Sequence, residues 1–219
     1  MMDFEYKAAI VEVSRRLARR GYVGTFEGNI SYRDGRRIFM TPTTQDKETL
    51  TEGKIICIDP DGKQIEGDLK KTSEYILHTE IYKMRPDVHS VVHCHAPFST
   101  AWAQAGQAYE SKCATEGILQ FGKVPCCRYG TPGTEAILGN LSEYVMDYDT
   151  VFLENHGVVA YAADPLTAFS KINSLENLLK TEFIRRLLFP HINNDLSEEE
   201  IQRLNKMGEK WHGYHKNEE

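Results

Sequence analysis

The sequence lacks any apolar stretch near the roughly 20 residues that a membrane-spanning helix requires. It has no long basic run either, and its formal net charge is −6. Nucleic acids and anionic membranes are bound mainly through clustered lysine and arginine, so we expect neither as a partner. The N-terminus contains Asp3 and Glu5 and lacks the basic and then apolar order of a secretion signal.

The five cysteines are odd in number and contain no C-x-x-C pair. This pattern argues against a disulfide framework and is typical of reduced thiols, so we expect a cytoplasmic protein. Cys94 lies between His93 and His95, but adjacent residues of a strand point to opposite faces of a sheet. We therefore exclude Cys94 from any ligand set.

No internal repeat, low-complexity tract or linker rich in Pro, Gly or Ser divides the chain. Its 219 residues, of which 41% are hydrophobic and 26% charged, suit one globular domain over 1–219. An acidic chain can still hold a locally positive pocket, so a small anionic substrate is compatible with this composition.

Periodic patterns of apolar residues predict short strands and helices along the whole chain. Strands are expected at 29–34, 36–41, 54–65 (as a hairpin), 88–94, 124–129, 150–155 and 157–161, and helices at 3–20, 72–84, from 97, 135–147, 164–188 and from 196. Turns at Asp34-Gly35 and at 60–62 imply hairpins and therefore antiparallel pairing. Hairpins mixed with helices favour an α+β fold, in which helices cover a largely antiparallel sheet.

His93 and His95 stand at alternate positions at the end of an apolar strand. Alternate strand residues share a face at a spacing of roughly 6–7 Å, which suits two imidazoles that bind one ion. His156 follows another apolar strand and precedes Gly157, which allows a sharp turn. Each motif alone is also typical of ordinary core or turn residues. Together they supply three histidines and leave a coordination position open for substrate, as in a catalytic metal site.

Lys70-Lys71-Thr72-Ser73-Glu74 opens a predicted helix. Thr72 and Ser73 suit either a helix cap or, with the exposed N–H groups of the helix end, an anion site. A carboxylate at Glu74 beside a metal can act as general base on a carbon acid next to a carbonyl, because the metal stabilises the enediolate.

A second group of neutral hydrogen-bonding residues precedes this helix. Gly28 permits close approach to the backbone, and Asn29 offers amide donors. Thr43 and Thr44 lie one hairpin further along the chain and add hydroxyl groups. Taken alone, these residues are typical of a turn and a strand.

The chain resembles the class II aldolase/adducin family in five segments, G-N-I-S, T-P-T, T-S-E, H-C-H-A-P and E-N-H-G, which occur in the family's order and spacing. The resemblance extends from about residue 5 to 187. It implies a three-layer α/β/α fold, a zinc-type ion (Zn²⁺, or another divalent metal such as Mn²⁺ or Co²⁺) and a homotetramer with active sites between neighbouring subunits. It also implies cleavage of a ketose 1-phosphate, such as L-fuculose 1-phosphate, to dihydroxyacetone phosphate and an aldehyde.

This resemblance also assigns roles to individual residues. By matching positions, His93, His95 and His156 resemble the metal ligands, and Glu74 resembles the catalytic acid/base. The residues that match the family's phosphate site are Gly28, Asn29, Thr43, Thr44, Thr72 and Ser73.

The chain departs from the family's pattern around the expected phosphate site. Thr44 stands where the family usually has glycine, and Phe26 and Glu27 stand where it has small residues. The carboxylate of Glu27 would repel a phosphate unless it turned to solvent. Lys70, or Lys71 where the family commonly has proline, could offset that charge.

Aldolases of the family also use a tyrosine from a neighbouring subunit as proton donor. Residues 113–115 occupy that position here and contain no tyrosine. Glu116 is the nearest acid–base candidate, although a glutamate here is also typical of ordinary surface charge, and Tyr109 is out of register. We therefore take Glu116 as the second catalytic candidate.

Other functions stay open within and beyond this family. Its ribulose-5-phosphate 4-epimerases carry aspartate at the position of Glu74, so glutamate here favours an aldolase. Residues 101–106, however, resemble the corresponding helix of the epimerases. Sugar-phosphate dehydratases and decarboxylases share the metal ligands. A non-catalytic, adducin-like scaffold would not need three histidines together with Glu74, and a structural zinc site would have four ligands, mostly cysteine.

Overall fold

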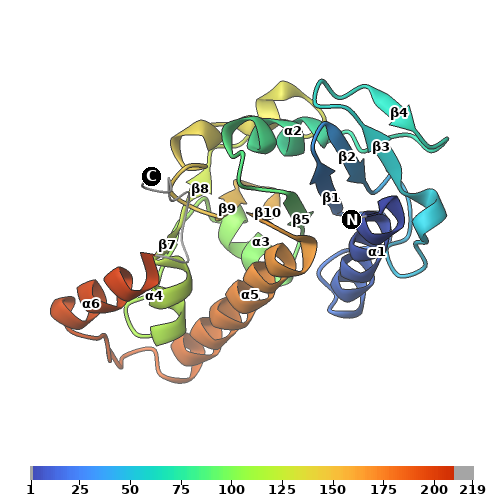
Figure 1. Cartoon of the computed structure of the whole chain (residues 1–219). Coiled ribbons are helices and arrows are strands. Elements are labelled where there is room, and N and C mark those ends of the chain that lie inside the picture. The colour runs from blue at the N-terminus through green and yellow to red at the C-terminus, as the bar shows by residue number, and fades with distance from the viewer. Residues whose placement is uncertain (1, 210–219) are drawn as a thin grey trace.

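An eight-stranded sheet forms the middle layer of the computed structural model, which describes residues 2–209 (Figure 1). Its strands are β1 (Asn29–Asp34), β2 (Arg37–Met40), β3 (Ile56–Ile58), β4 (Gln64–Glu66), β5 (Ser90–Cys94), β8 (Cys126–Cys127), β9 (Thr150–Leu153) and β10 (Gly157–Ala162). They lie in the order β4-β3-β2-β1-β5-β10-β9-β8. Neighbouring strands are antiparallel except for β8 and β9, so the expectation of a largely antiparallel sheet is confirmed. A second, two-stranded sheet pairs β6 (Tyr109–Glu110) with β7 (Lys123–Val124).

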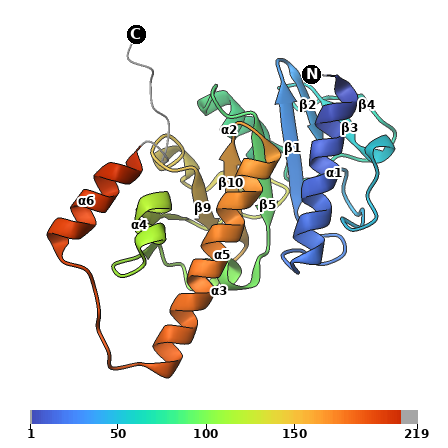
Figure 2. The same cartoon turned by 60° about the horizontal axis from the view of Figure 1, so that its bottom comes forward.

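Helices cover both faces of the large sheet and give the expected three-layer α/β/α arrangement (Figures 1 and 2). One face carries α1 (Asp3–Arg19), α3 (Pro97–Gln104) and α5 (Pro165–Leu188), and the other carries α2 (Tyr75–Met84) with the 3-10 turns η2 (Glu135–Leu138) and η3 (Leu141–Glu143). A third 3-10 turn, η1 (Glu52–Lys54), lies between β2 and β3. The helices α4 (Thr115–Phe121) and α6 (Glu198–Gly208) pack together beside this body. Within residues 2–209, no helix combines the length and apolar character that crossing a membrane would require.

Alternation along β5 divides its side chains between the two apolar layers. Val92 and Cys94 pack in the layer that contains α1 and α5, whereas Val91 packs in the layer that contains α2. His93 therefore faces the α2 layer, and Cys94 faces away from it. This confirms the reason for excluding Cys94 from the ligand set.

The carboxylate of Glu176, on α5, holds the start of α3 directly after β5. It accepts hydrogen bonds from the backbone N–H groups of Phe98 and Ser99 at 2.7 and 2.9 Å. These N–H groups have no partner within the helix, so the buried carboxylate supplies their acceptors. Its negative charge also interacts favourably with the positive N-terminal end of the helix dipole. The chain that follows the H-x-H segment is fixed in place by this contact.

Three predicted elements differ in the structure. The helix expected from Thr72 begins at Tyr75. The chain just before Thr72 is extended, because Lys71 forms an antiparallel β-bridge with Pro42. The strand expected at 124–129 is divided between β7 and β8. The helix expected at 135–147 is wrong: Gly139, at φ +49°, separates η2 from η3.

The other expected elements are present within a few residues of their predicted ends. Asp164 caps α5 and Ser197 caps α6, each by accepting a backbone N–H. The expectation of a single domain over 1–219 stays a prediction, and residue 1 and residues 210–219 lie outside the described residues.

Candidate metal centre and active site

Three histidine rings converge where β5 meets the turn before β10. The ring centroids of His93 and His95 are 5.2 Å apart, those of His93 and His156 4.6 Å, and those of His95 and His156 5.1 Å. One nitrogen atom of each ring lies within 4.8 Å of the other two. The structure thus brings together the three histidines that the sequence indicated, in an arrangement that could hold one metal ion.

The turn between β9 and β10 brings His156 to the other two rings. Asn155 adopts the left-handed conformation with φ +57°, which asparagine tolerates better than most residues. Gly157 was expected to provide the sharp turn, but its role is to leave space. A Cβ atom at Gly157 would lie 2.6 Å from the carbonyl oxygen of Cys94 and 2.9 Å from Cδ2 of His95.

Hydrogen bonds leave an unpaired nitrogen on each ring. Nδ1 of His93 donates to the carbonyl oxygen of Val158 at 2.9 Å, so its Nε2 carries the lone pair. Within the described part of the chain, Nε2 of His93, Nε2 of His95 and Nδ1 of His156 are buried without a hydrogen-bonding partner. Buried polar atoms are almost always paired, so an orphaned nitrogen on each of three neighbouring rings fits a metal ion that would accept their lone pairs.

Burial also keeps the central ring in the state that a metal requires. It lowers the pKa of His93 to about 3, against the attraction of the Glu74 carboxylate. A neutral imidazole can bind a divalent cation, whereas an imidazolium has no free lone pair. His93 is therefore ready to bind a metal at neutral pH.

The carboxylate of Glu74 lies directly beside these rings, at the residue before α2. Its Oε1 is 3.2 Å from Nε2 of His156, and its Oε2 is 3.4 Å from Nε2 of His93. Oε2 also accepts a hydrogen bond from Nδ2 of Asn29 at 2.6 Å. Burial alone would raise the pKa of Glu74, but His93, His156 and Asn29 together outweigh it and hold this pKa below its usual range. Glu74 is thus an ionised base next to the metal ligands.

A cleft of about 130 Å³ opens beside Glu74. Five of the six residues expected to bind phosphate line it: Gly28, Asn29, Thr43, Thr72 and Ser73. The other lining residues are Phe26, Glu27, Pro42, Glu74 and His95. Among the described residues, none that lines the cleft is lysine or arginine. Lys71 is engaged elsewhere, because its Nζ donates to the carbonyl oxygen of Gly62 and lies over the ring of Tyr75.

Two backbone positions at this cleft depart from ordinary conformations. Gly28 has φ +69°, and a Cβ atom there would lie 2.7 Å from Val23 Cγ1 and 2.9 Å from the carbonyl oxygen of His93. Only glycine fits this contact between β1 and β5. Thr44 has φ +53°, a conformation that is costly for a β-branched residue, and it does not line the cleft.

Glu27 turns toward the histidines, which sequence reasoning did not foresee. Its Oε2 lies 3.2 Å from Nδ1 of His95, an arrangement that orients the ring and directs Nε2 toward the other two imidazoles. The N–H of Gly24 donates to the same carboxylate and is the main reason why the pKa of Glu27 lies below its usual range. The one sign of this role in the sequence was that Glu27 stands where the family usually has a small residue.

We expect Glu27→Ala to raise the dissociation constant for Zn²⁺ by about 10-fold or more, because outer carboxylates of this kind typically contribute 10- to 100-fold. Glu27→Gln should have a smaller effect, since its amide oxygen can still accept from Nδ1 of His95. Competition with a coloured chelator would measure both constants. Glu48→Ala, at an exposed position, is the control, and an unchanged constant in Glu27→Ala would remove Glu27 from this role.

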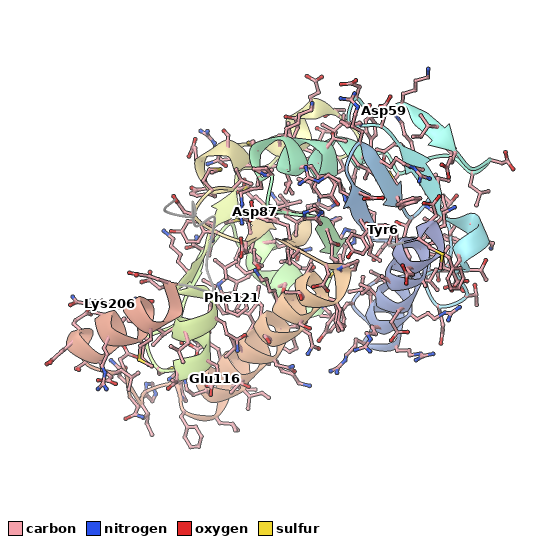
Figure 3. The ribbon with its side chains drawn as sticks, viewed as in Figure 1. Tyr6, Asp59, Asp87, Glu116, Phe121 and Lys206 are labelled. Carbon is pink, nitrogen blue, oxygen red and sulfur yellow. The ribbon has the colours of Figure 1, made fainter. Side chains whose placement is uncertain are left out.

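Glu116 lies apart from the metal ligands within one chain. It is exposed on α4 and lines a different cleft of about 590 Å³ with Tyr109 and Cys113. Within residues 2–209, this cleft and the one beside Glu74 have no lining residue in common. Figure 3 shows Glu116 on α4, and Figures 1 and 2 agree in placing α4 away from β1.

Known proteins are similar to this chain over most of its length. Residues 8–183 match the family model described as Class II Aldolase and Adducin N-terminal domain. An L-fuculose phosphate aldolase of Methanocaldococcus jannaschii is 31% identical over 182 residues, which cover 83% of this chain and 98% of that protein.

Solved structures share the fold at lower sequence identity. An L-fuculose 1-phosphate aldolase superposes with a TM-score of 0.83 at 22% identity, covering 92% of this chain and 95% of its own. A protein of Escherichia coli described as a candidate aldolase/epimerase/decarboxylase also superposes with a TM-score of 0.83, at 24% identity. The match covers 93% of this chain and 99% of that protein. At these identities the likeness establishes the architecture of the chain.

Proposed function

This chain belongs to the class II aldolase and adducin family, and we propose that it is a divalent-metal-dependent aldolase, a carbon–carbon lyase. Its substrate is a ketose 1-phosphate of the L-fuculose 1-phosphate type, which it cleaves to dihydroxyacetone phosphate and an aldehyde. The observation that carries this proposal is the convergence of three imidazoles, each with an unpaired buried nitrogen, beside the carboxylate of Glu74.

The metal ligands in this proposal are His93, His95 and His156, and Zn²⁺, Mn²⁺ or Co²⁺ suits three nitrogen donors. When bound, such an ion would act as a Lewis acid and stabilise negative charge on the oxygen atoms of the substrate. Three protein ligands leave room for substrate, as in other catalytic sites.

Glu74 moves the proton at the reacting carbon. In the condensing direction its carboxylate accepts a proton from the hydroxyl-bearing carbon of dihydroxyacetone phosphate, next to the carbonyl. The electron pair left on that carbon forms the bond to the aldehyde. In the cleaving direction Glu116 takes the proton of the hydroxyl group that becomes the aldehyde, this bond breaks, and Glu74 returns the other proton to the carbon.

The cleft beside Glu74 is the proposed phosphate site. Its hydroxyl and amide groups, on Asn29, Thr43, Thr72 and Ser73, can donate to phosphate oxygens, and Gly28 allows close approach to the backbone. We include Thr44 because it directly follows Pro42 and Thr43, which line the cleft. Glu27 faces His95 instead of the middle of this site, which reduces the repulsion that its charge would otherwise cause.

We assign Glu116 to the active site of a neighbouring subunit in a homotetramer, as proton donor to the aldehyde oxygen. Support comes from its position on α4, at a cleft separate from the metal ligands of its own chain. A 4-epimerase is the second candidate function, since 101–106 resembles that branch, although glutamate at position 74 favours the aldolase.

The first experiment is aldol cleavage of a panel of ketose 1-phosphates: L-fuculose, L-rhamnulose, D-ribulose and 5-deoxyribulose phosphates. We expect release of dihydroxyacetone phosphate, read by a coupled assay, and its loss when a chelator is added. The preferred sugar phosphate identifies the aldehyde half. If the metal-loaded protein released no dihydroxyacetone phosphate from any of these sugar phosphates, the aldolase assignment would be contradicted. Epimerase, dehydratase or decarboxylase chemistry would then be favoured.

A further inference from the structure

A line of polar side chains crosses the apolar layer between α2 and β1. His78 and Tyr82 are four residues apart and so lie on one face of α2, and Glu74, the residue before this helix, is four residues before His78. Asn29 and Ser31 are alternate residues of β1 and point to the same face of the sheet. The two periodicities bring five polar groups together in an otherwise apolar layer.

These groups form a continuous chain of short hydrogen bonds. Nδ2 of Asn29 donates to Oε2 of Glu74 at 2.6 Å, and Oδ1 of Asn29 is 2.5 Å from Nε2 of His78. Nδ1 of His78 is 2.6 Å from Oγ of Ser31, which is 2.6 Å from the hydroxyl of Tyr82. His78 and Ser31 are 0% exposed, so water cannot replace the contacts that the ring of His78 makes.

The direction of every bond follows from the orientation of the Asn29 amide. Its Nδ2 group donates to Glu74, so its Oδ1, which can only accept, faces His78. Nε2 of His78 must therefore carry the hydrogen atom, and in a neutral ring Nδ1 then accepts from the hydroxyl of Ser31. Ser31 in turn accepts from the hydroxyl of Tyr82.

Burial supports the neutral ring that this order needs. It lowers the pKa of His78 to about 4, against the attraction of the Glu74 carboxylate. Burial also raises the pKa of Tyr82, which keeps its hydroxyl protonated and able to donate. The hydroxyl of Tyr82 has the carbonyl oxygen of His89 as a longer alternative acceptor, at 3.2 Å.

We propose that His78 is a positioning residue for the reaction, because its Nε2–H group holds Oδ1 of Asn29 and thereby keeps the amide NH₂ on Glu74. If the amide turned over, its oxygen would face the carboxylate and its NH₂ would face an N–H donor. Asn29 also lines the cleft, so the same amide touches both the base and the proposed phosphate site. This inference rests on the proposed function for the role of Glu74, whereas the hydrogen-bond chain itself does not.

The first test needs no activity. In the full, metal-loaded chain labelled with ¹⁵N-histidine, we expect His78 to be a neutral ring protonated at Nε2 at pH 7, its signals being assigned by their loss in His78→Gln. A ring protonated at Nδ1 would overturn the proposal, because Oδ1 of Asn29 would then have no donor. If His78→Gln fails to fold, the signals of His78 are assigned in the wild type from the through-space contact of its ring with the side chain of Ser31.

The second test separates positioning from a structural role. We expect His78→Phe to lower kcat by about 10- to 100-fold with little change in KM or metal content, as for other outer residues that orient a catalytic group. His78→Gln can still donate to Asn29 and should retain more of kcat. In an Asn29→Ala background, His78→Phe should have almost no further effect, since it acts through Asn29.

The two proposals fail in different ways. A wild-type enzyme that cleaves none of the sugar phosphates would contradict the proposed function, while the ring tautomer would still report on His78. Additive losses in His78→Phe and Asn29→Ala, in an active and metal-loaded enzyme, would overturn the positioning role alone.

Discussion

Replacing Glu74 by glutamine is expected to lower kcat for aldol cleavage by about 10²- to 10⁴-fold, the usual contribution of a general base, while metal content stays that of the wild type. Glutamine has nearly the same shape as glutamate. Its amide oxygen can accept from Nδ2 of Asn29, whereas the contact of Oε1 with Nε2 of His156, at 3.2 Å in the wild type, is lost. The variant therefore removes the base and leaves the packing in place.

Proton exchange offers the most direct measurement for this variant. Dihydroxyacetone phosphate alone, in D₂O, should exchange a proton at its hydroxyl-bearing carbon with the wild type and not with Glu74→Gln. Glu80→Gln is the matched control, because Glu80 lies on the same helix and pairs with Lys83 at the surface. Exchange at the wild-type rate in metal-loaded Glu74→Gln would exclude Glu74 as the base.

The sequence predicted best those features that depend on short-range periodicity. H-x-H on an apolar strand was sufficient to place His93 on one face and Cys94 on the other, since alternation along a strand has no exceptions without a bulge. The hairpin of β1 and β2 followed from its turn in the same way. The long helix α5 followed from its cap at Asp164 and its apolar face.

Features that depend on contacts between distant segments were predicted less well. The helix expected at 135–147 failed because Gly139 lies against Arg128, where a Cβ atom would be 2.2 Å from the carbonyl oxygen. The contact of Glu27 with His95 joins two loops, and His78 meets Asn29 across 49 positions of sequence. No local pattern marks such pairs, and the position of Glu116 relative to a neighbouring subunit depends on assembly.

Replacing His156 by alanine is expected to remove most of the stabilisation that a bound metal provides. A ligand present at 100 times its dissociation constant stabilises the folded state by about 2.7 kcal/mol, which raises Tm by roughly 5–10 °C for a chain of this size. With one of three imidazoles missing, we expect Zn²⁺ at the same concentration to give little shift in Tm. Turnover should fall by roughly 10³-fold, because a Lewis acid supplies several kcal/mol of transition-state stabilisation.

The comparison must separate the metal from the histidine itself. Both proteins are first melted after exhaustive chelation, which measures what His156 contributes without metal, through its contacts with Glu74 and with the other two rings. His191→Ala, at an exposed position outside the site, should keep the full metal-dependent shift of the wild type. If His156→Ala showed the same shift and bound one ion per chain, His156 would not be a ligand, and a metal site would have to be built from His93, His95 and the carboxylate of Glu74. The loss of turnover in Glu74→Gln would then be accompanied by loss of metal, so the two variants together distinguish a base beside three ligands from a carboxylate that is itself a ligand.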